Sequence, residues 1–415
     1  MGGKDKKKNT STAKKIVGDS IWSISGLLLM NVVAQFLVYP IWNKKLGNES
    51  HGFILYLLSM MNTYTVTVAL ACNYARMRAS AFGDTFNRTY NRIMVIASAI
   101  AVPYTLIVLF VSGIEKSTPI EVILFVVLTV VTMWRYYADV EYRLTLNYKG
   151  YFIYYLIISV GYGIGILLFL WTGIWPLALL LGEFAGVGVV FFKGRVLHPD
   201  MEEVVEDRRL IIKTVIALIS TDIISNLVYN GDRVVLNFAL GGTAVTVFYQ
   251  ASLLGKTMTL ITTPLNSVLI GYLARSKVQL NRKFMKVLSV CLLGATIVIS
   301  LLCIPVAHLL IKILYPQNYD LVKEFFFLAN AAQVAYFISG IGTMVLLRYC
   351  EMKNLLYVNF VYGAFFLALC IPAALWFGLS GFCVALLITC VMRILIVLYL
   401  GYAFVRKNEE RRDQS

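Results

Sequence analysis

The sequence predicts an all-α integral membrane protein, in which twelve transmembrane helices form two pseudo-repeated six-helix halves around a central cavity. Of its 415 residues, 59% are hydrophobic and only 14% are charged, whereas a soluble protein has about 25% charged residues. Apolar runs of roughly 20 residues, the length that a helix needs to cross a bilayer, recur along the chain. A short repeat also relates its two halves.

Apolar windows separated by short polar loops define the expected spans. They are 16–41, 52–73, 93–113, 118–138, 151–172, 174–192, 211–240, 243–273, 286–312, 322–347, 355–376 and 380–404. The chain then divides into a retained basic cytoplasmic tail (1–15), an N-terminal half (16–193), a cytoplasmic linker (194–210), a C-terminal half (211–404) and a charged cytoplasmic tail (405–415).

The repeat lies at the junction of two spans in each half. "LGNESHGFILYLL", from Leu46 to Leu58, aligns with "LGGTAVTVFYQAS", from Leu240 to Ser252, at an offset of 194 residues. The first segment joins spans one and two, and the second joins spans seven and eight. Internal repeats of this kind are typical of secondary transporters.

The distribution of Lys and Arg predicts the orientation. If the N-terminus is cytoplasmic, 29 of the 37 cationic residues lie inside, five lie in outer loops and three lie within spans. The positive-inside rule then places both termini in the cytoplasm. We attribute the net charge of +15 to this topology and to contact with anionic membrane lipids, and not to nucleic acid.

Several function classes are excluded by what the sequence lacks. The seven cysteines form no CxxC pair and do not cluster with the three histidines, so neither a disulfide framework nor a metal site is expected. We expect no cofactor. The outer loops are roughly ten residues or shorter, which leaves no domain for the catalytic residues of a glycosyl polymerase or ligase, and we predict that the protein is not an enzyme.

Charged and polar residues lie on one face of span seven, within and before "LVYNGDRVVLNFALGG" (Leu227 to Gly242). An ionised side chain at the centre of a bilayer costs about 2.5–3.5 kcal/mol. Four spans carry polar residues, and their polar faces are expected to meet one another or a water-filled cavity. The polar positions are Asp222, Asn226, Tyr229, Arg233 and Asn237 in span seven, Ser252, Lys256, Thr259 and Thr263 in span eight, Asn31 and Gln35 in span one, and Ser59, Asn62 and Thr63 in span two.

Each intramembrane cation also has a purely structural interpretation. Arg233 lies about eight residues from the outer end of its span, roughly 12 Å, so it could reach the headgroups. Lys256 and Arg393 lie deeper, and for them the alternative is an ion pair between helices, with Glu183 or Asp222 as the partner.

Four short motifs resemble those of one family. "GDSIWSISGLLL" followed by "YPIWNKKLGNESHG" is similar to the opening of bacterial polysaccharide flippases. "DRVVLNFALGGTAVTVFYQAS", "LYPQNYD" and "FGLSGFCVA" resemble later segments of the same family, in the same order. These are the O-antigen and exopolysaccharide lipid-carrier flippases of the multidrug/oligosaccharidyl-lipid/polysaccharide exporter superfamily. His51 replaces the usual Tyr, and Asp19 the usual Asn.

The resemblance implies a V-shaped bundle of two six-helix halves in the inner (cytoplasmic) membrane. It implies transport of an undecaprenyl-diphosphate-linked oligosaccharide from the cytoplasmic to the outer leaflet by alternating access, with polysaccharide polymerase machinery as a further partner. Twelve spans, where the lipid II flippase branch has fourteen, favour the polysaccharide branch. An ion-coupled multidrug exporter of the same superfamily is the alternative, although such exporters favour acidic cavities.

A diphosphate headgroup requires cations held in a low-dielectric site. Lys256 is the first candidate, followed by Arg233 and Arg393, while Arg76 and Arg78 stand at the cytoplasmic end of span two. Asn31, Tyr229 and Trp22 are candidates for sugar contacts.

The chain contains no P-loop "GxxxxGK[ST]", so uphill transport would need an ion gradient or downstream consumption of the glycan. Asp222 is the candidate carboxylate for ion coupling, and Glu183 is the alternative.

Overall fold

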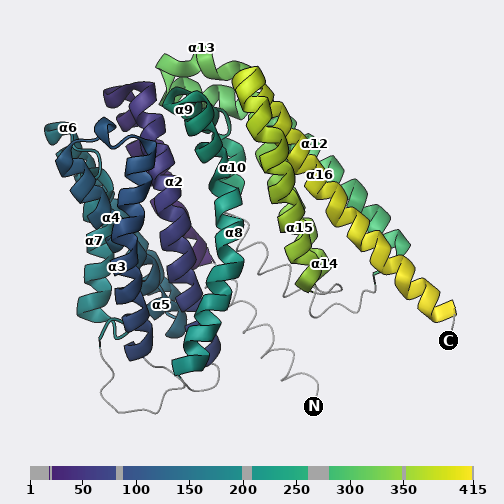
Figure 1. Cartoon of the computed structure of the whole chain (residues 1–415), viewed down its shortest axis with the longest axis horizontal. Coiled ribbons are helices and arrows are strands. Elements are labelled where there is room, and N and C mark those ends of the chain that lie inside the picture. The colour runs from purple at the N-terminus through teal and green to yellow at the C-terminus, as the bar shows by residue number, and fades with distance from the viewer. Residues whose placement is uncertain are drawn as a thin grey trace. The chain divides into compact units, whose positions relative to one another are not determined.

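The protein is described here by a computed structural model, which covers residue 18 and residues 21–80, 87–198, 208–259, 280–347 and 352–413. Every regular element within these ranges is a helix. Figure 1 shows the long helices of each part of the chain. The all-α prediction is therefore confirmed for these ranges. The physical reason is that a segment inside a bilayer satisfies its backbone hydrogen bonds internally only as a helix or a closed barrel.

Each of the twelve predicted spans overlaps a helix in the described part of the chain. Residues 21–33 are helical and continue into a short π-helical turn at Ala34–Val38. The main helices that follow are α2 (Tyr39–Ser80), α3 (Asn87–Ser112), α4 (Pro119–Ala138), α5 (Val140–Leu144), α6 (Tyr148–Thr172), α7 (Leu177–Lys193), α8 (Arg208–Leu240), α9 (Gly242–Ala251), α10 (Leu253–Thr259), α12 (Arg282–Leu314), α13 (Tyr319–Val322), α14 (Phe326–Leu347), α15 (Met352–Phe365) and α16 (Ile371–Asp413).

Seven helical stretches among the described residues are long and apolar enough to cross a membrane. Two of them, Ile21–Ala79 and Tyr357–Glu410, each cover two predicted spans. In both, a glycine interrupts the helix: Gly47 has φ 81° and Gly378 has φ 62°.

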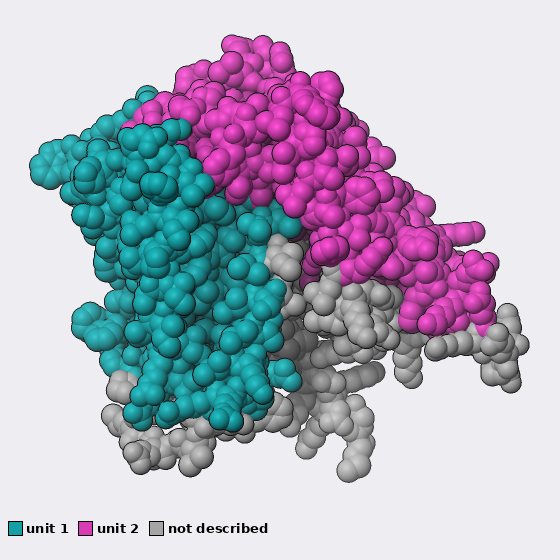
Figure 2. Space-filling model, viewed as in Figure 1, with its two compact units in different colours: residues 1–45, 57–230 teal, residues 46–56, 231–415 magenta. Residues whose placement is uncertain are grey.

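Contacts divide the chain into two compact units, coloured separately in Figure 2. Unit 1 consists of the residues up to Lys45 together with Leu57–Asn230, and unit 2 of Leu46–Tyr56 together with Gly231–Ser415. Within unit 1, α7 packs against α6 and α4, and α4 packs against α3. Within unit 2, α14 packs against α12, α16 and α10, and α15 packs against α16.

Local sequence signals fix several helix ends. Thr118 and Glu121 form a capping box before α4, and Pro119 occupies its first position. The Asn147 side chain accepts a hydrogen bond from the backbone of Gly150 at the start of α6, and Asn281 caps α12 in the same way. These caps satisfy backbone N–H groups that the first turn of a helix leaves without partners.

The first aligned glycine of the predicted repeat has nearly the same backbone conformation in its two copies. Gly47 has φ 81° and ψ 175°, and Gly241, which the alignment places opposite it, has φ 83° and ψ 178°. Residues with a Cβ rarely adopt this conformation. The repeat is therefore confirmed at the junction that follows the first span of each half.

The two junctions pack against each other inside unit 2. A Cβ on Gly52 would lie 1.7 Å from the Gly242 carbonyl oxygen, and a Cβ on Gly242 would lie 2.2 Å from the Glu49 carbonyl oxygen. The Glu49 carboxylate accepts hydrogen bonds from the backbone N–H groups of Gly242 (3.1 Å) and Thr243 (2.8 Å). A carboxylate at the N-terminus of a helix is favoured by the helix dipole, so Glu49 fixes the start of α9.

We expect Gly52→Ala to destabilise the protein, because the added methyl group meets backbone atoms that cannot rotate away. Overpacking of this kind lowers the free energy of unfolding by about 1–3 kcal/mol or more. The matched control is Gly294→Ala, since a Cβ at Gly294 meets nothing within 4 Å. Thermal unfolding in detergent should separate the two variants, and equal melting temperatures would show that the junction is not closely packed.

Candidate functional site

A buried ion pair lies at the centre of the candidate site in unit 2. Lys256 of α10 places its Nζ atom 2.5 Å from Oδ2 of Asp232, which belongs to α8. The side chains are 8% and 4% exposed, so both charges are withdrawn from solvent. Lys256 was expected to be the leading cation of the site. Its partner was expected to be Glu183 or Asp222 if it formed a structural pair, and that expectation is wrong.

A break between α9 and α10 positions Lys256. The break lies at Ser252, and Asn330 of α14 bridges it: its Nδ2 atom donates to the Ala251 carbonyl oxygen (2.6 Å), and its Oδ1 atom accepts from the Gly255 N–H group (2.9 Å). The amide therefore satisfies backbone groups that the break frees. Lys256 follows Gly255 directly, so Asn330 fixes the turn that carries the ammonium group.

Arg233 contacts protein groups next to the ion pair. Its backbone N–H group donates to Oδ1 of Asp232 (2.8 Å), and its Nη1 atom donates to the Leu55 carbonyl oxygen (3.4 Å). The guanidinium carbon lies 5.3 Å from the centre of the Tyr249 ring, which is a cation–π distance. Arg233 is half-buried.

Arg393 of α16 lies in an aromatic and amide environment. It is 6% exposed, and its Nη2 atom donates to Oδ1 of Asn359 (3.1 Å). The guanidinium carbon lies 4.3 Å from the centre of the Tyr336 ring and 5.2 Å from that of the Tyr362 ring. Within the described ranges no ion pair joins Arg393 to a carboxylate, so the expected pairing with Glu183 or Asp222 is not seen.

The described spans of unit 2 therefore contain an excess of positive charge. Three cations, Lys256, Arg233 and Arg393, lie deep in these helices together with one carboxylate, Asp232. Glu49 lies apart from this group, at the start of α9, where it caps backbone N–H groups. An anion that binds there would offset this excess, so the composition favours an anionic ligand over a cationic one.

The buried charges of unit 1 are matched differently. The Nε atom of Arg135 lies 2.7 Å from Oε2 of Glu183, and the two side chains are 2% and 3% exposed. The Tyr162 hydroxyl donates to the other Glu183 oxygen at 2.5 Å. Arg135 lies in α4, three residues before the helix ends, and hydropathy windows do not distinguish a buried charge at such a position from one in the adjoining loop.

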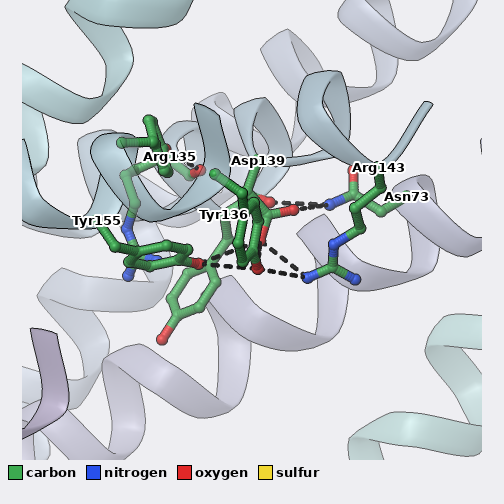
Figure 3. A network of polar contacts seen from close by, with 8 residues as sticks. Asn73, Arg135, Tyr136, Asp139, Arg143 and Tyr155 are labelled. Atoms are coloured by element: carbon green, nitrogen blue, oxygen red, sulfur yellow. Dashed lines mark hydrogen bonds and ion pairs between the residues drawn. The ribbon is translucent and has the colours of Figure 1, made fainter. Parts of the chain in front are cut away.

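A second network in unit 1 surrounds Asp139 (Figure 3). Asp139 is 1% exposed and accepts hydrogen bonds from Nδ2 of Asn73 (3.2 Å), Nη2 of Arg143 (2.9 Å) and the hydroxyl groups of Tyr151 and Tyr155 (3.2 Å each). This network was not expected from the sequence. Its one sequence signal is the spacing of Asp139 and Arg143, four residues apart on a helical turn.

The two cations expected at the cytoplasmic end of the second span have different environments. Arg76 is 2% exposed and donates to the Tyr137 hydroxyl (2.9 Å) and to Oδ1 of Asn87. Arg78 is exposed. Arg76 is thus part of the packed interior of unit 1, while Arg78 remains accessible.

The remaining candidates lie on the first span and on α8. Asn31 donates to the Leu27 carbonyl oxygen of its own helix (2.8 Å). Asp222 and Tyr229 are half-buried. Nearby on α8, Asn226 donates to the Thr67 hydroxyl (2.9 Å) and Asn230 to the Thr63 hydroxyl (3.2 Å). Thr63 and Thr67 belong to α2, so the expected contact between polar residues of the second and seventh spans is confirmed inside unit 1.

The fold is that of a group of known membrane transporters. No protein-family model matches the sequence, and none of the curated protein sequences does. Among solved structures, the lipid II flippase MurJ in an inward closed conformation has a TM-score of 0.69 at 12% identity, over 91% of this chain and 87% of that one. An inward-facing multidrug resistance MATE family transporter of the MOP superfamily has a TM-score of 0.68 at 12% identity, over 94% and 99% of the two chains.

The Vibrio cholerae MATE transporter VcmN in its bent form is also similar, with a TM-score of 0.61 and 16% identity over 96% of this chain and 98% of that one. Identities this low establish the fold and not the substrate. The chain is thus an integral membrane protein with the fold shared by MATE transporters and MurJ. The neighbours are transporters and flippases, and not enzymes.

We expect the Arg135–Glu183 pair to stabilise unit 1 only as a pair. Removing one partner of a buried ion pair typically lowers the free energy of unfolding by about 3–5 kcal/mol, because the remaining charge stays buried, whereas replacing both partners is far milder. Arg135→Met should therefore melt well below Arg135→Met/Glu183→Gln in detergent. A double variant that is as unstable as the single one would contradict this interpretation.

Proposed function

We propose that the protein is a flippase that moves undecaprenyl-diphosphate-linked oligosaccharide units from the cytoplasmic to the outer leaflet of the inner membrane, for polysaccharide biosynthesis. Transport occurs by alternating access, with both termini in the cytoplasm. The membrane lipids and polysaccharide polymerase machinery are further proposed partners. The fold shared with a lipid II flippase and with multidrug transporters supports the general class.

The observation that supports an anionic substrate is the excess of cations in the described spans of unit 2. Lys256, Arg233 and Arg393 are accompanied by one carboxylate, Asp232, among the described residues deep in these helices. A diphosphate supplies the missing negative charge and several oxygen acceptors for charge-assisted hydrogen bonds. The sequence resemblance to polysaccharide flippases supplies the prenyl carrier and the glycan.

An ion-coupled multidrug exporter of the same superfamily is the second candidate. The similarity to MATE transporters favours it. The charge distribution of unit 2 favours it less, because a cationic drug would meet more cations than carboxylates among the described residues deep in these helices.

We expect Lys256→Ala and Arg233→Ala each to lower flux of lipid-linked glycan by roughly tenfold or more, since each removes a charge-assisted contact with the diphosphate. Lys256→Arg should be milder. Flux is measured in proteoliposomes as the lipid-linked glycan exposed at the opposite leaflet. The control is Lys407→Ala, an exposed residue of α16. Wild-type flux in both alanine variants, with protein inserted normally, would contradict the proposal.

For ion coupling we propose the carboxylate of Asp222, which is half-buried in α8. An imposed proton or sodium gradient should accelerate wild-type flux, and Asp222→Asn should abolish that response while leaving flux down a substrate gradient. An Asn variant that responds as the wild type does would exclude Asp222, and Glu183→Gln would then be tested as the alternative carrier. A wild type that ignores both gradients would exclude ion coupling.

A further inference from the structure

We propose that Asp232 is an internal counter-ion that competes with the anionic headgroup for Lys256. In the structure the Asp232 carboxylate forms an ion pair with the Lys256 ammonium group. A diphosphate headgroup would take its place, and release of Asp232 would accompany binding. This inference rests on the proposed function, because it specifies how the substrate gains access to the leading cation of the site.

The observed pair neutralises Lys256. The two charged atoms are 2.5 Å apart and both side chains are more than nine-tenths buried. A lysine in direct contact with a carboxylate presents little net charge to a second anion. A diphosphate can therefore use the charge of Lys256 fully only when the carboxylate moves away.

Asp232 is held by fewer described contacts than the buried carboxylate of Asp139 in unit 1. Its Oδ2 atom contacts Lys256, and its Oδ1 atom accepts a hydrogen bond from the backbone of Arg233, the next residue. Asp139, in contrast, is bound by four side chains from three helices (Figure 3). Among the side-chain contacts described for Asp232, the ion pair is the one that joins it to another helix.

The surrounding charges favour the exchange. Arg233 and Arg393 lie in the same unit as Lys256, and each contacts a tyrosine ring. The described charged side chains deep in these helices are three cations and one carboxylate, and a diphosphate adds negative charge to them. A lipophilic cation that displaced Lys256 from Asp232 would instead add to the positive charge. The exchange therefore also gives specificity for anions over cations.

The test is a double-mutant cycle on the full-length protein in detergent, with farnesyl diphosphate as the probe and calorimetric titration as the readout. Competition predicts that Asp232→Asn binds the probe roughly tenfold more tightly than wild type, because Lys256 loses its competitor. Lys256→Gln should bind more weakly, and Asp232→Asn/Lys256→Gln should match Lys256→Gln. The control is Asp320→Asn, which breaks an exposed ion pair with Lys323 and should not change affinity.

Three outcomes would overturn the inference. Weaker binding by Asp232→Asn would show that Asp232 positions Lys256, and unchanged binding would show that it does not compete. Equal tightening in the presence and absence of Lys256 would show general repulsion by the carboxylate. If neither wild type nor Asp232→Asn binds the probe, the proposed function fails together with this inference. If wild type binds the probe and Asp232→Asn binds it no more tightly, the inference alone fails.

A second measurement uses wild-type protein, in case Asp232→Asn does not fold. Dicyclohexylcarbodiimide modifies protonated carboxyl groups in apolar surroundings, and mass spectrometry locates the adduct. Competition predicts that farnesyl diphosphate increases modification of Asp232 relative to Asp139, which remains bound in unit 1. Unchanged or reduced modification of Asp232 would contradict release of the carboxylate.

Discussion

The hydrocarbon core of a bilayer requires every charged side chain in a span to find its partners within the protein or in a ligand. Two buried carboxylates described in unit 1 meet this requirement within the protein. Its Arg135–Glu183 pair is completed by Tyr162, and Asp139 is surrounded by donors that include Arg143. We interpret these networks as structural.

Among the described residues deep in its helices, unit 2 holds more cations than carboxylates. Asp232 pairs with Lys256, and Arg233 and Arg393 contact aromatic rings and carbonyl or amide oxygens. The backbone of this unit is fixed where the charges lie. Glu49 caps α9, closely packed glycines join the two junctions, and Asn330 bridges the break before Lys256. A fixed backbone that holds excess cations is suited to receive an anion, since preorganisation lowers the cost of binding.

Much of the fold could be predicted from the sequence because hydropathy alone identifies long apolar helices. The repeat was also predictable, since Gly47 and Gly241 occupy equivalent positions and share a backbone conformation that favours glycine. The partner of Lys256 was not predictable. Spacing on a helix places Arg233, and not Asp232, on the polar face of span seven. The direction in which the Lys256 side chain points depends on the breaks at Gly241 and Ser252, which helical periodicity does not describe.

Arg135 shows a second limit. It lies three residues before the end of α4, and hydropathy does not show that Glu183 of another helix holds it in the protein interior. Asn330 gave no signal either, because its role depends on a break in a helix about 75 residues earlier in the chain. Both cases depend on contacts between distant segments, which local sequence patterns do not report.

The central claim is that the excess positive charge of unit 2 selects a diphosphate-bearing lipid. The most direct measurement is ligand-dependent thermal stabilisation of the wild-type protein, with farnesyl diphosphate compared with tetraphenylphosphonium, because a ligand that binds the folded state raises its melting temperature. Our account predicts stabilisation by farnesyl diphosphate and none by the cation. Stabilisation by tetraphenylphosphonium alone would contradict it and would favour a multidrug exporter.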